Sequence, residues 1–319
     1  MKYYLAPMEG ITGYIYRNLY QEFFHNVDKY FTPFVSPNQN HCLQKKELKD
    51  IAPEHNEGMV VVPQILTNRA DYFTETEKMM KELGYKEVNL NLGCPSGTVA
   101  AKGKGSGFLA KKEELDLFLE EIFSHAVTKI SVKTRLGRHK HEEFYELIEI
   151  FNKYPIEELI IHPRVQKEYY KNKPNLEVFA DALRTSKNPV CYNGNIFTAK
   201  DYQEFTTKFP QVECIMCGRG VIGNPGLIDE IKEGVFLEKH TLKAFHDKLY
   251  NSYQQVLSGD KTVLFKMKEM WYYMIHIFSN HEIYEKKIRK AAKCSEYDRI
   301  IAKLFREEEI IKGKGFYFI

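Results

Sequence analysis

The chain alternates between short apolar runs and longer stretches in which apolar residues recur every three or four positions. Eight of the short runs are typical of β-strands, because they are rich in aliphatic and aromatic residues and are bounded by turn-forming residues. These runs are Tyr3–Met8, Lys29–Val35, Met59–Leu66, Glu87–Leu92, Lys129–Arg135, Glu158–His162, Pro189–Asn193 and Glu213–Cys217. The longer stretches predict amphipathic helices over Arg69–Leu83, Lys112–Ala126, His141–Lys153, Asn175–Leu183 and Ala199–Phe209.

This alternation predicts the fold class. Near-continuous apolar strands separated by helices favour a parallel sheet that helices cover. Eight strand–helix units within residues 1–230 favour an α/β fold of the (β/α)₈ TIM-barrel type over an open doubly wound sheet. No GxGxxG motif follows the first strand, which argues against a Rossmann fold.

The strand–helix rhythm stops near residue 231. Helical periodicity continues over Leu242–Leu257, Lys261–Phe278 and Ile283–Phe305. We therefore expect two domains, a catalytic barrel at 1–230 and an all-α domain at 231–319. The segment Leu264–Ile277, which contains the only tryptophan, is more typical of a helix-bundle core than of a recognition surface.

Charge adds a weak indication about partners. The net charge is only +3, but residues from Ile231 onward carry 17 Lys and Arg against 12 Asp and Glu. Five of these cations cluster between Lys286 and Lys293. Such asymmetry is consistent with a polyanion bound by the helical domain, and equally with solvated helix faces.

No segment predicts a membrane or secretory location. No apolar run approaches the roughly 20 residues that span a bilayer, and the N-terminal MKYYLAPMEG lacks the apolar core of a signal peptide. The six scattered cysteines suit a reducing compartment better than a disulfide framework. We expect a cytoplasmic monomer that makes no membrane contact.

The CxxC spacing of Cys214 and Cys217 does not predict a metal site. The two residues lie in an expected strand, where positions three apart point to opposite faces. One zinc ion could hardly use both, so we interpret them as core packing and expect no metal.

Polar residues end most of the expected strands. In a TIM barrel the carboxyl ends of the strands carry the catalytic residues. The residues concerned are Glu9, Gln64, Asn91, Cys94, Lys133, Arg135, His162, Arg164, Asn193, Asn195 and Arg219. Any one of them could be a satisfied structural residue, but their recurrence at seven strand ends predicts a site.

Two of these strand ends are more specific. Asn193-Gly194-Asn195 and Gly218-Arg219-Gly220 follow the seventh and eighth strands. Barrels build phosphate sites there from backbone N–H groups, to which glycine allows close approach. Arg219 can add a bidentate contact. We therefore expect a phosphorylated ligand.

The stretch from Glu87 to Gly107 combines a strand with a reactive residue type. Its amides alternate with aliphatic residues, Cys94 stands at the strand end, and a loop with Gly103, Gly105 and Gly107 follows. A single cysteine is more often buried filler than a reagent, so this stretch alone does not establish a reaction.

Taken in order, five motifs resemble those of the dihydrouridine synthase family of flavin-dependent RNA-modifying enzymes, over nearly the whole chain. The motifs are Ala6-Pro7-Met8-Glu9-Gly10-Ile11-Thr12, Asn91-Leu92-Gly93-Cys94-Pro95, Val132-Lys133-Thr134-Arg135-Leu136-Gly137, His162-Pro163-Arg164, and Asn193-Gly194 with Gly218-Arg219-Gly220. The resemblance implies reduction of the C5=C6 bond of uridine in tRNA, with FMN as cofactor and NADPH as reductant.

The resemblance also implies a role for each strand-end residue. Cys94 is the general acid that protonates uracil C5, since a thiol with a reference pKa of about 8.5 is mostly protonated at neutral pH. Asn91, Arg135 and Arg164 bind the substrate. The flavin ring is met by Pro7, Met8, Glu9, Gln64, Lys133 and His162. Its ribityl chain and phosphate are held by Asn193, Gly194, Asn195, Gly218 and Arg219.

Three positions depart from the family pattern. Gly13, Asn89 and Asn195 stand where the family usually has acidic residues. The central residues are intact, so the departures bear on the substrate, and tRNA, rRNA and the particular uridine stay open. Two other classes also remain: a flavin enzyme acting on a free pyrimidine, as dihydroorotate dehydrogenases do, and a non-catalytic RNA-binding protein.

Overall fold

Parallel strands form the central sheet of the protein, whose computed structural model describes residues 1–40 and 43–316. The strands are β1 (Lys2–Leu5), β2 (Lys29–Phe31), β3 (Val61–Val62), β4 (Gln64–Ile65), β5 (Glu87–Leu92), β6 (Lys129–Gly137), β7 (Leu159–Val165), β8 (Val190–Tyr192) and β9 (Cys214–Cys217). Their order in the sheet is β3-β2-β1-β9-β8-β7-β6-β5-β4.

The sheet closes into a barrel at Pro63. The two strands at the ends of that order, β3 and β4, are separated in the chain by this proline alone. Proline has no N–H to donate, so it interrupts the hydrogen-bond ladder, while its carbonyl accepts from Asn89 N. The strand expected over Met59–Leu66 is therefore two short strands, and the predicted TIM-barrel fold is confirmed.

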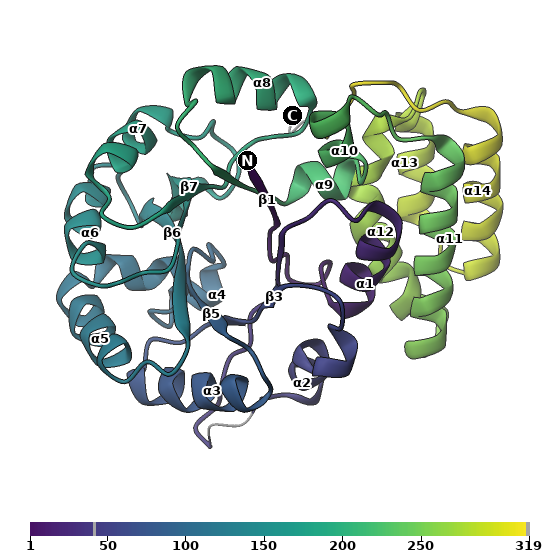
Figure 1. Cartoon of the computed structure of the whole chain (residues 1–319). Helices are drawn as coiled ribbons and strands as arrows, with labels where there is room; N and C mark the ends of the chain where they lie inside the picture. The colour runs from purple at the N-terminus through teal and green to yellow at the C-terminus, as the bar shows by residue number, and fades with distance from the viewer. Residues whose placement is uncertain (41–42, 317–319) are drawn as a thin grey trace. The chain divides into compact units, whose positions relative to one another are not determined.

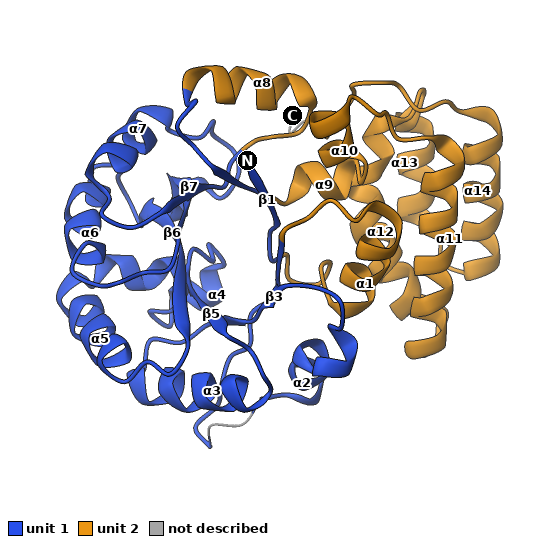
Figure 2. Ribbon diagram, in the orientation of Figure 1, with its two compact units in different colours: residues 1–7, 29–194, 209–216 blue, residues 8–28, 195–208, 217–319 orange. Residues whose placement is uncertain are grey.

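By packing, the chain divides into two compact units (Figure 2). Unit 1 comprises residues 1–7, 29–194 and 209–216, and unit 2 comprises residues 8–28, 195–208 and 217–319. The functional division expected at residue 230 stays a prediction, because these units reflect packing rather than activity.

Unit 1 contains the sheet and the helices around it (Figure 1). Its α-helices are α2 (Lys45–Ile51), α3 (Ala70–Glu82), α4 (Gly97–Ala100), α5 (Lys112–Ser124), α6 (Glu143–Phe151) and α7 (Leu176–Thr185); its 3₁₀ turns are η1 (Pro53–His55), η2 (Gly105–Ala110) and η3 (Gln166–Glu168). A buried cluster with Tyr4, Phe31, Ile160 and Cys214 forms a core contributed by several strands. Met216 belongs to the same cluster, which is the alternation expected of a strand.

Unit 2 is helical. It contains α1 (Tyr14–Phe24), α8 (Ala199–Lys208), α9 (Arg219–Gly223), α10 (Leu227–Glu233), α11 (Lys239–Val256), α12 (Asp260–Met274), η4 (Ile275–Ile277), α13 (His281–Lys290) and α14 (Cys294–Glu307). Trp271 is 2% exposed, and its indole donates to Tyr297 Oη at 2.6 Å. The aromatic segment is thus bundle core, as predicted. In the described part of the chain, no helix is both long and apolar enough to cross a membrane.

The helix expected over Ile283–Phe305 was wrong, because two helices occupy this stretch. The chain leaves α13 at Ala291, in extended backbone with ψ at 127°, and α14 begins at Cys294. Hydrogen bonds from α12 hold the break: Lys268 Nζ donates to Ala291 O, and Asp260 Oδ2 accepts from Cys294 N. These tertiary bonds outweigh the helix propensity of the two alanines at 291 and 292.

Candidate functional site

Strand register brings the predicted polar residues of unit 1 together. Asn91 is paired in register with Lys133, and Arg135 with His162. Residues two apart share one face of a strand, so His162 lies on the same face of β7 as Ile160, which belongs to the buried core cluster. The register of β5, β6 and β7 therefore places Asn91 beside Lys133 and Arg135 beside His162 on neighbouring strands.

A chain of side-chain hydrogen bonds joins β4, β5 and β6. Asn91 Nδ2 donates to Gln64 Oε1 at 2.7 Å, and Gln64 Nε2 donates to Asn89 Oδ1 at 2.8 Å. Asn89 Nδ2 then donates to Ser131 Oγ at 2.9 Å. All four side chains are buried, and each bond fixes the orientation of the next amide.

Asn91 also shapes the turn that carries Cys94. Its Oδ1 accepts from the backbone N–H groups of Gly93 and Cys94, at 3.0 and 2.9 Å. On the other side of the turn, Ser106 Oγ and Ser106 N donate to Cys94 O. Cys94 is a half-buried thiol whose backbone is held at both peptide groups.

The glycine-rich segment after Cys94 is more ordered than a simple loop. It contains α4 and η2, and Gly105 to Leu109 are buried. A side chain at Gly107 would overlap the backbone of Ala100, so glycine permits the close approach. The backbone of Cys94 is therefore packed on one side by this glycine-rich segment.

Lys133 is a cation that has no ionic partner among residues 1–40 and 43–316. It is half-buried, and within the described part of the chain it forms no ion pair. Burial, and then the neighbouring Arg135 guanidinium, lower the pKa of Lys133 to about 8, although the Cys94 thiol acts in the opposite direction. An anionic group of a ligand would therefore find an uncompensated positive charge here.

Arg135 connects the cysteine turn to the end of β7. Its Nε donates to Gly93 O and its Nη1 to Val165 O, both at 3.0 Å. Burial is the main reason why the pKa of Arg135 lies below its ordinary value. Arg135 therefore holds two loops together, and its predicted substrate contact stays a prediction.

His162 and Arg164 form a buried pair on β7. Arg164 Nη1 lies 2.7 Å from His162 Nε2, and its Nε donates to Asn172 O. An arginine can only donate, so His162 Nε2 accepts and the ring proton resides on Nδ1. This contact fixes the tautomer of the histidine.

Tyr170 joins the cluster although the sequence interpretation did not include it. Its ring lies 5.4 Å from the Arg135 guanidinium carbon and 5.9 Å from the His162 ring, measured to the ring centroid. The side chain remains 38% exposed. An exposed aromatic pair in a polar loop, Tyr169-Tyr170, was the sequence signal that could have found it.

At the ends of β1 and β8, unit 1 contributes the remaining predicted residues. Asn193 Nδ2 donates to Met216 O at 2.8 Å. The Tyr192 ring lies against Gly194, where no side chain would fit. Pro7 is half-buried where β1 ends.

Within unit 2, Met8 and Glu9 lie on a tight turn. Met8 N donates to Thr12 Oγ1 at 2.8 Å, and Met8 O accepts from Thr12 N at 3.0 Å. Glu9 is exposed on this turn. The positive φ of Gly10, 84°, suits glycine.

Of the three other predicted residues of unit 2, Asn195 and Arg219 contact each other. Arg219 Nη2 donates to Asn195 Oδ1 at 2.9 Å, and the guanidinium lies over the Phe197 ring. Gly218 precedes Arg219 as the N-cap of α9. The asparagine that stands at the usually acidic position 195 thus orients a cation.

Comparisons with known proteins identify relatives along most of the chain. The family model described as Dihydrouridine synthase (Dus) matches residues 4–309. A protein of Staphylococcus aureus (strain Mu50) named "Probable tRNA-dihydrouridine synthase" is 28% identical over 264 residues, covering 79% of this chain and 78% of its own. "Probable tRNA-dihydrouridine synthase 2" of Bacillus subtilis (strain 168) is 28% identical over 259 residues, with the same coverage.

Solved structures with a similar fold are more distant in sequence. Morphinone reductase in complex with tetrahydroNAD has a TM-score of 0.53 and 8% identity, over 74% of this chain and 88% of its own. Histamine dehydrogenase from Rhizobium sp. 4-9 has a TM-score of 0.56 and 12% identity, over 84% of this chain and 49% of its own. At such identities the similarity concerns the fold.

Proposed function

The chain belongs to the dihydrouridine synthase family, and we propose that it reduces the C5=C6 bond of uridine in tRNA to 5,6-dihydrouridine, with FMN as cofactor and NADPH as reductant. The names of its relatives support the substrate, and their coverage of about four fifths of both chains supports transfer of the whole activity. The observation that carries the proposal is the cluster of Asn91, Cys94 and Lys133, in which Asn91 accepts from Cys94 N and is paired in register with Lys133.

The residues present fit a flavin. The amide chain through Gln64 offers directional donors and acceptors, and the unpaired Lys133 offers a positive charge for a ring that becomes anionic on reduction. We assign the ring to Gln64, Lys133 and His162 in unit 1, with Pro7, and to Met8 and Glu9 in unit 2. When bound, FMN supplies the hydride that C6 of uracil accepts.

Five residues, two in unit 1 and three in unit 2, are assigned to the ribityl chain and phosphate. In unit 1, Asn193 is followed by Gly194, at which a side chain is excluded. In unit 2, Asn195 holds the Arg219 guanidinium, a group suited to bidentate phosphate contacts, beside Gly218.

Cys94 is assigned the proton transfer. Hydride addition at C6 leaves negative charge spread over C5 and the neighbouring carbonyl, and a proton donor at C5 must neutralise it. Cys94 Sγ donates that proton, while Asn91 and Ser106 hold its backbone at a defined position. Asn91 Oδ1 is engaged by the turn and one N–H of its amide donates to Gln64, so we assign the second N–H of that amide to the uracil edge.

Arg135 and Arg164 are assigned to the substrate as cations that also fix the surrounding loops. Each donates to a backbone carbonyl, at Val165 and Asn172 respectively. A substrate phosphate or carbonyl near them would be met by donors that are already oriented, which lowers the entropic cost of binding.

Nucleoside mass spectrometry tests the proposal. Unmodified tRNA and rRNA are incubated separately with the purified protein, FMN and NADPH. We expect a gain of two daltons on uridine in the tRNA, the mass of the two hydrogens added. A gain confined to rRNA would keep the reaction and change the substrate.

Two companion measurements distinguish the rival classes: the same incubation with a free pyrimidine in place of RNA, and the colour of the purified protein. Reduction of a free pyrimidine without any gain in RNA would indicate a dihydroorotate dehydrogenase-like enzyme. A colourless protein that binds RNA without flavin would indicate a non-catalytic binding protein. Either result would overturn the proposal.

A further inference from the structure

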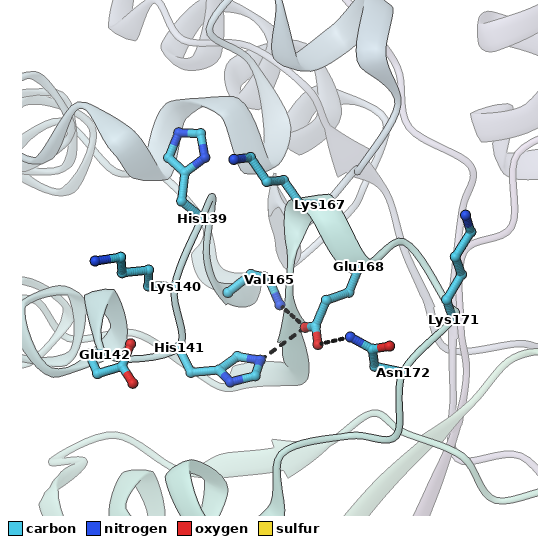
Figure 3. Close-up of a pocket in the computed structure, with 9 residues that line it drawn as sticks. All are labelled: His139, Lys140, His141, Glu142, Val165, Lys167, Glu168, Lys171 and Asn172. Carbon is cyan, nitrogen blue, oxygen red and sulfur yellow. Dashed lines mark hydrogen bonds and ion pairs between the residues drawn. The ribbon is translucent and has the colours of Figure 1, made fainter.

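A pocket of about 450 Å³, lined mostly by residues with charged or polar side chains, lies in unit 1 between the loops that follow β6 and β7 (Figure 3). The first loop contributes His139, Lys140 and His141, and the second contributes Lys167, Glu168 and Lys171. Its size is that of a small-molecule site rather than of a groove for a folded partner. None of the lining residues has a role in the proposed reaction.

Carboxylates inside the loops organise both of them. Glu168 accepts from Val165 N at 2.7 Å, His141 Nε2 at 3.0 Å and Asn172 Nδ2 at 2.7 Å. Burial acts to raise the pKa of Glu168, but the Asn172 and His141 bonds outweigh it, so the pKa lies below its ordinary value. Its negative charge is thus already satisfied by donors of the protein.

The first loop is organised in the same way. Glu143 accepts from the backbone N–H groups of Arg138, His139 and Lys140, at 2.8 to 2.9 Å. The backbone that presents His139 and Lys140 is therefore fixed before any ligand arrives.

The lysines of the pocket have no such partner. Lys140, Lys167 and Lys171 are exposed, and none of them forms an ion pair with a residue in the described ranges. Lys167 and His139 extend away from the Glu168 carboxylate, which turns towards His141 and Asn172 (Figure 3). Glu142 is the one lining carboxylate outside these networks, so positive charge prevails.

Backbone strain marks the second loop. Tyr169, between Lys167 and Lys171, has φ at 50° and ψ at −95°, a conformation that a residue with a side chain rarely adopts. Such strain persists only where the surroundings enforce it, and it concentrates at ligand-binding segments. Here the Glu168 bonds enforce it.

The pocket is also connected to the candidate site. The carbonyls of Val165 and Asn172, two lining residues, accept from Arg135 and Arg164 respectively. A ligand held in the pocket would therefore be held beside the arginines of the reaction site.

We propose that this pocket is a phosphate-binding site in which Lys167 and His139, which lie near each other (Figure 3), bind a phosphate group of a ligand that reaches the reaction site, while Lys140 and Lys171 add positive charge at its edges. Ammonium groups donate charge-assisted hydrogen bonds to phosphate oxygens. The inference rests on the proposed function, which involves two phosphorylated partners besides FMN, whose phosphate is assigned to other residues: a nicotinamide dinucleotide with a 2′-phosphate, and RNA.

Equilibrium binding tests the pocket without requiring turnover. The variant carries Lys167→Gln and Lys171→Gln together. The matched control carries Lys86→Gln and Lys187→Gln, two exposed lysines of unit 1 that precede β5 and β8 and therefore lie at the opposite ends of the strands. Both lose two charges. Titration calorimetry measures the affinity of each protein for adenosine 2′,5′-bisphosphate. Filter binding measures its affinity for a tRNA transcript.

We expect one of the two affinities to fall by about tenfold in the pocket variant and to stay unchanged in the control. Loss for adenosine 2′,5′-bisphosphate assigns the pocket to the dinucleotide, and the variant should then lose its preference for NADPH over NADH. Loss for the transcript assigns it to an RNA phosphate. If both ligands bind the pocket variant as they bind the control, the phosphate site is refuted.

This outcome is separable from the fate of the proposed function. A wild-type protein that forms dihydrouridine, together with a pocket variant that binds like the control, would refute the pocket alone. A wild-type protein without dihydrouridine activity whose anion binding still depends on Lys167 and Lys171 would refute the proposed function alone.

Discussion

At the scale of single residues, Asn91 combines a structural and a chemical task. The alternation of β5 places its amide beside that of Asn89, on one face of the strand. Its oxygen is used by the turn before Cys94 and its nitrogen by Gln64. An asparagine is suited to both tasks because one end of its amide only accepts and the other only donates.

Replacing Cys94 by alanine should separate the two halves of the reaction. Cys94→Ala keeps the turn, since Asn91 and Ser106 bond to backbone atoms, and it should keep bound FMN and its reduction by NADPH. Dihydrouridine formation should fall by about 10² to 10⁴ through loss of the general acid. Cys294→Ala, at another half-buried thiol, is the matched control. Full activity of Cys94→Ala on RNA would contradict the assignment.

The charge of Lys133 predicts a pH dependence. Its lowered pKa of about 8 means that the ammonium is charged below that pH and loses its charge as the pH rises through it. A bound anionic ring would raise this value, so flavin reduction by NADPH should slow above an inflection at or beyond about 8. Rapid-mixing measurements of flavin absorbance without RNA test this.

Two substitutions test whether the charge of Lys133 causes this pH dependence of flavin reduction. Lys133→Arg keeps a charge across this range and should abolish the inflection. Lys133→Met should slow reduction roughly 10²-fold at every pH, as loss of one preorganised donor does. An inflection that persists in both variants would assign the titration to another group.

At the scale of elements, α12 supports the turn that carries Met8 and Glu9. Lys266 Nζ donates to Gly10 O at 2.5 Å, and the Glu269 carboxylate adjoins Gly10. All of these residues belong to unit 2. A helix outside the strand–helix repeats thus positions a motif from the start of the chain.

Removing this bond should affect cofactor retention more than stability. Lys266→Met loses the hydrogen bond to Gly10 O, and we expect FMN to dissociate about fivefold to tenfold more readily. Lys261→Met, at an exposed position of the same helix, is the control. Fluorescence titration of FMN measures both. Equal FMN affinities in the two variants would remove the positioning role.

A buried histidine makes the helical unit sensitive to acid. His246 Nε2 lies 2.6 Å from Tyr297 Oη, and its Nδ1 lies 2.9 Å from Asp247 Oδ1. The same Tyr297 oxygen accepts a hydrogen bond from the indole of Trp271. Burial lowers the pKa of His246, despite the opposing effect of Asp247. The unfolded chain therefore takes up a proton at a higher pH than the folded protein does.

This difference in proton uptake makes the free energy of unfolding depend on pH. The contribution of His246 to stability is fully present above about pH 6.5, the unfolded pKa, and is lost as the pH falls through the lower folded pKa. Urea unfolding between pH 7.5 and 5 should show a stability loss in the wild type that is smaller in His246→Gln. Parallel curves for the two proteins would contradict the prediction.

At the scale of the whole molecule, the C-terminal helices present their cations to solvent. Lys286, Lys287, Arg289, Lys290 and Lys293 are all exposed, while Tyr284 and Ile288 of α13 are buried. This arrangement leaves the five cations accessible to the phosphates of an RNA.

Neutralising three of these cations should weaken RNA binding in a salt-dependent way. For Lys286→Gln, Lys287→Gln and Lys290→Gln combined, the slope of log affinity against log salt should decrease in magnitude by about 2 to 3. Phosphate contacts release counterions, which is why salt reports their number. Unchanged affinity and slope would leave the patch as solvated surface.

The amino-acid sequence by itself determined the barrel, the order of its polar strand ends and the family. These features depend on local periodicity, on strand alternation and on short motifs, all of which are written along the chain. Gln64, Asn91, Cys94, Lys133 and His162 were found in this way. The confirmed part of the prediction is therefore the fold and the family, while the roles of these residues remain proposals.

Only the tertiary structure decided features that depend on partners far away in the chain. The break after α13 follows from bonds to α12, against the local preference for helix. The lowered pKa of Lys133 follows from burial beside Arg135. The pocket between the β6 and β7 loops follows from carboxylates that bind backbone donors and leave the pocket lysines without an ion pair in the described part of the chain. Such effects are set by which groups meet in space, and strand periodicity carries no information about them.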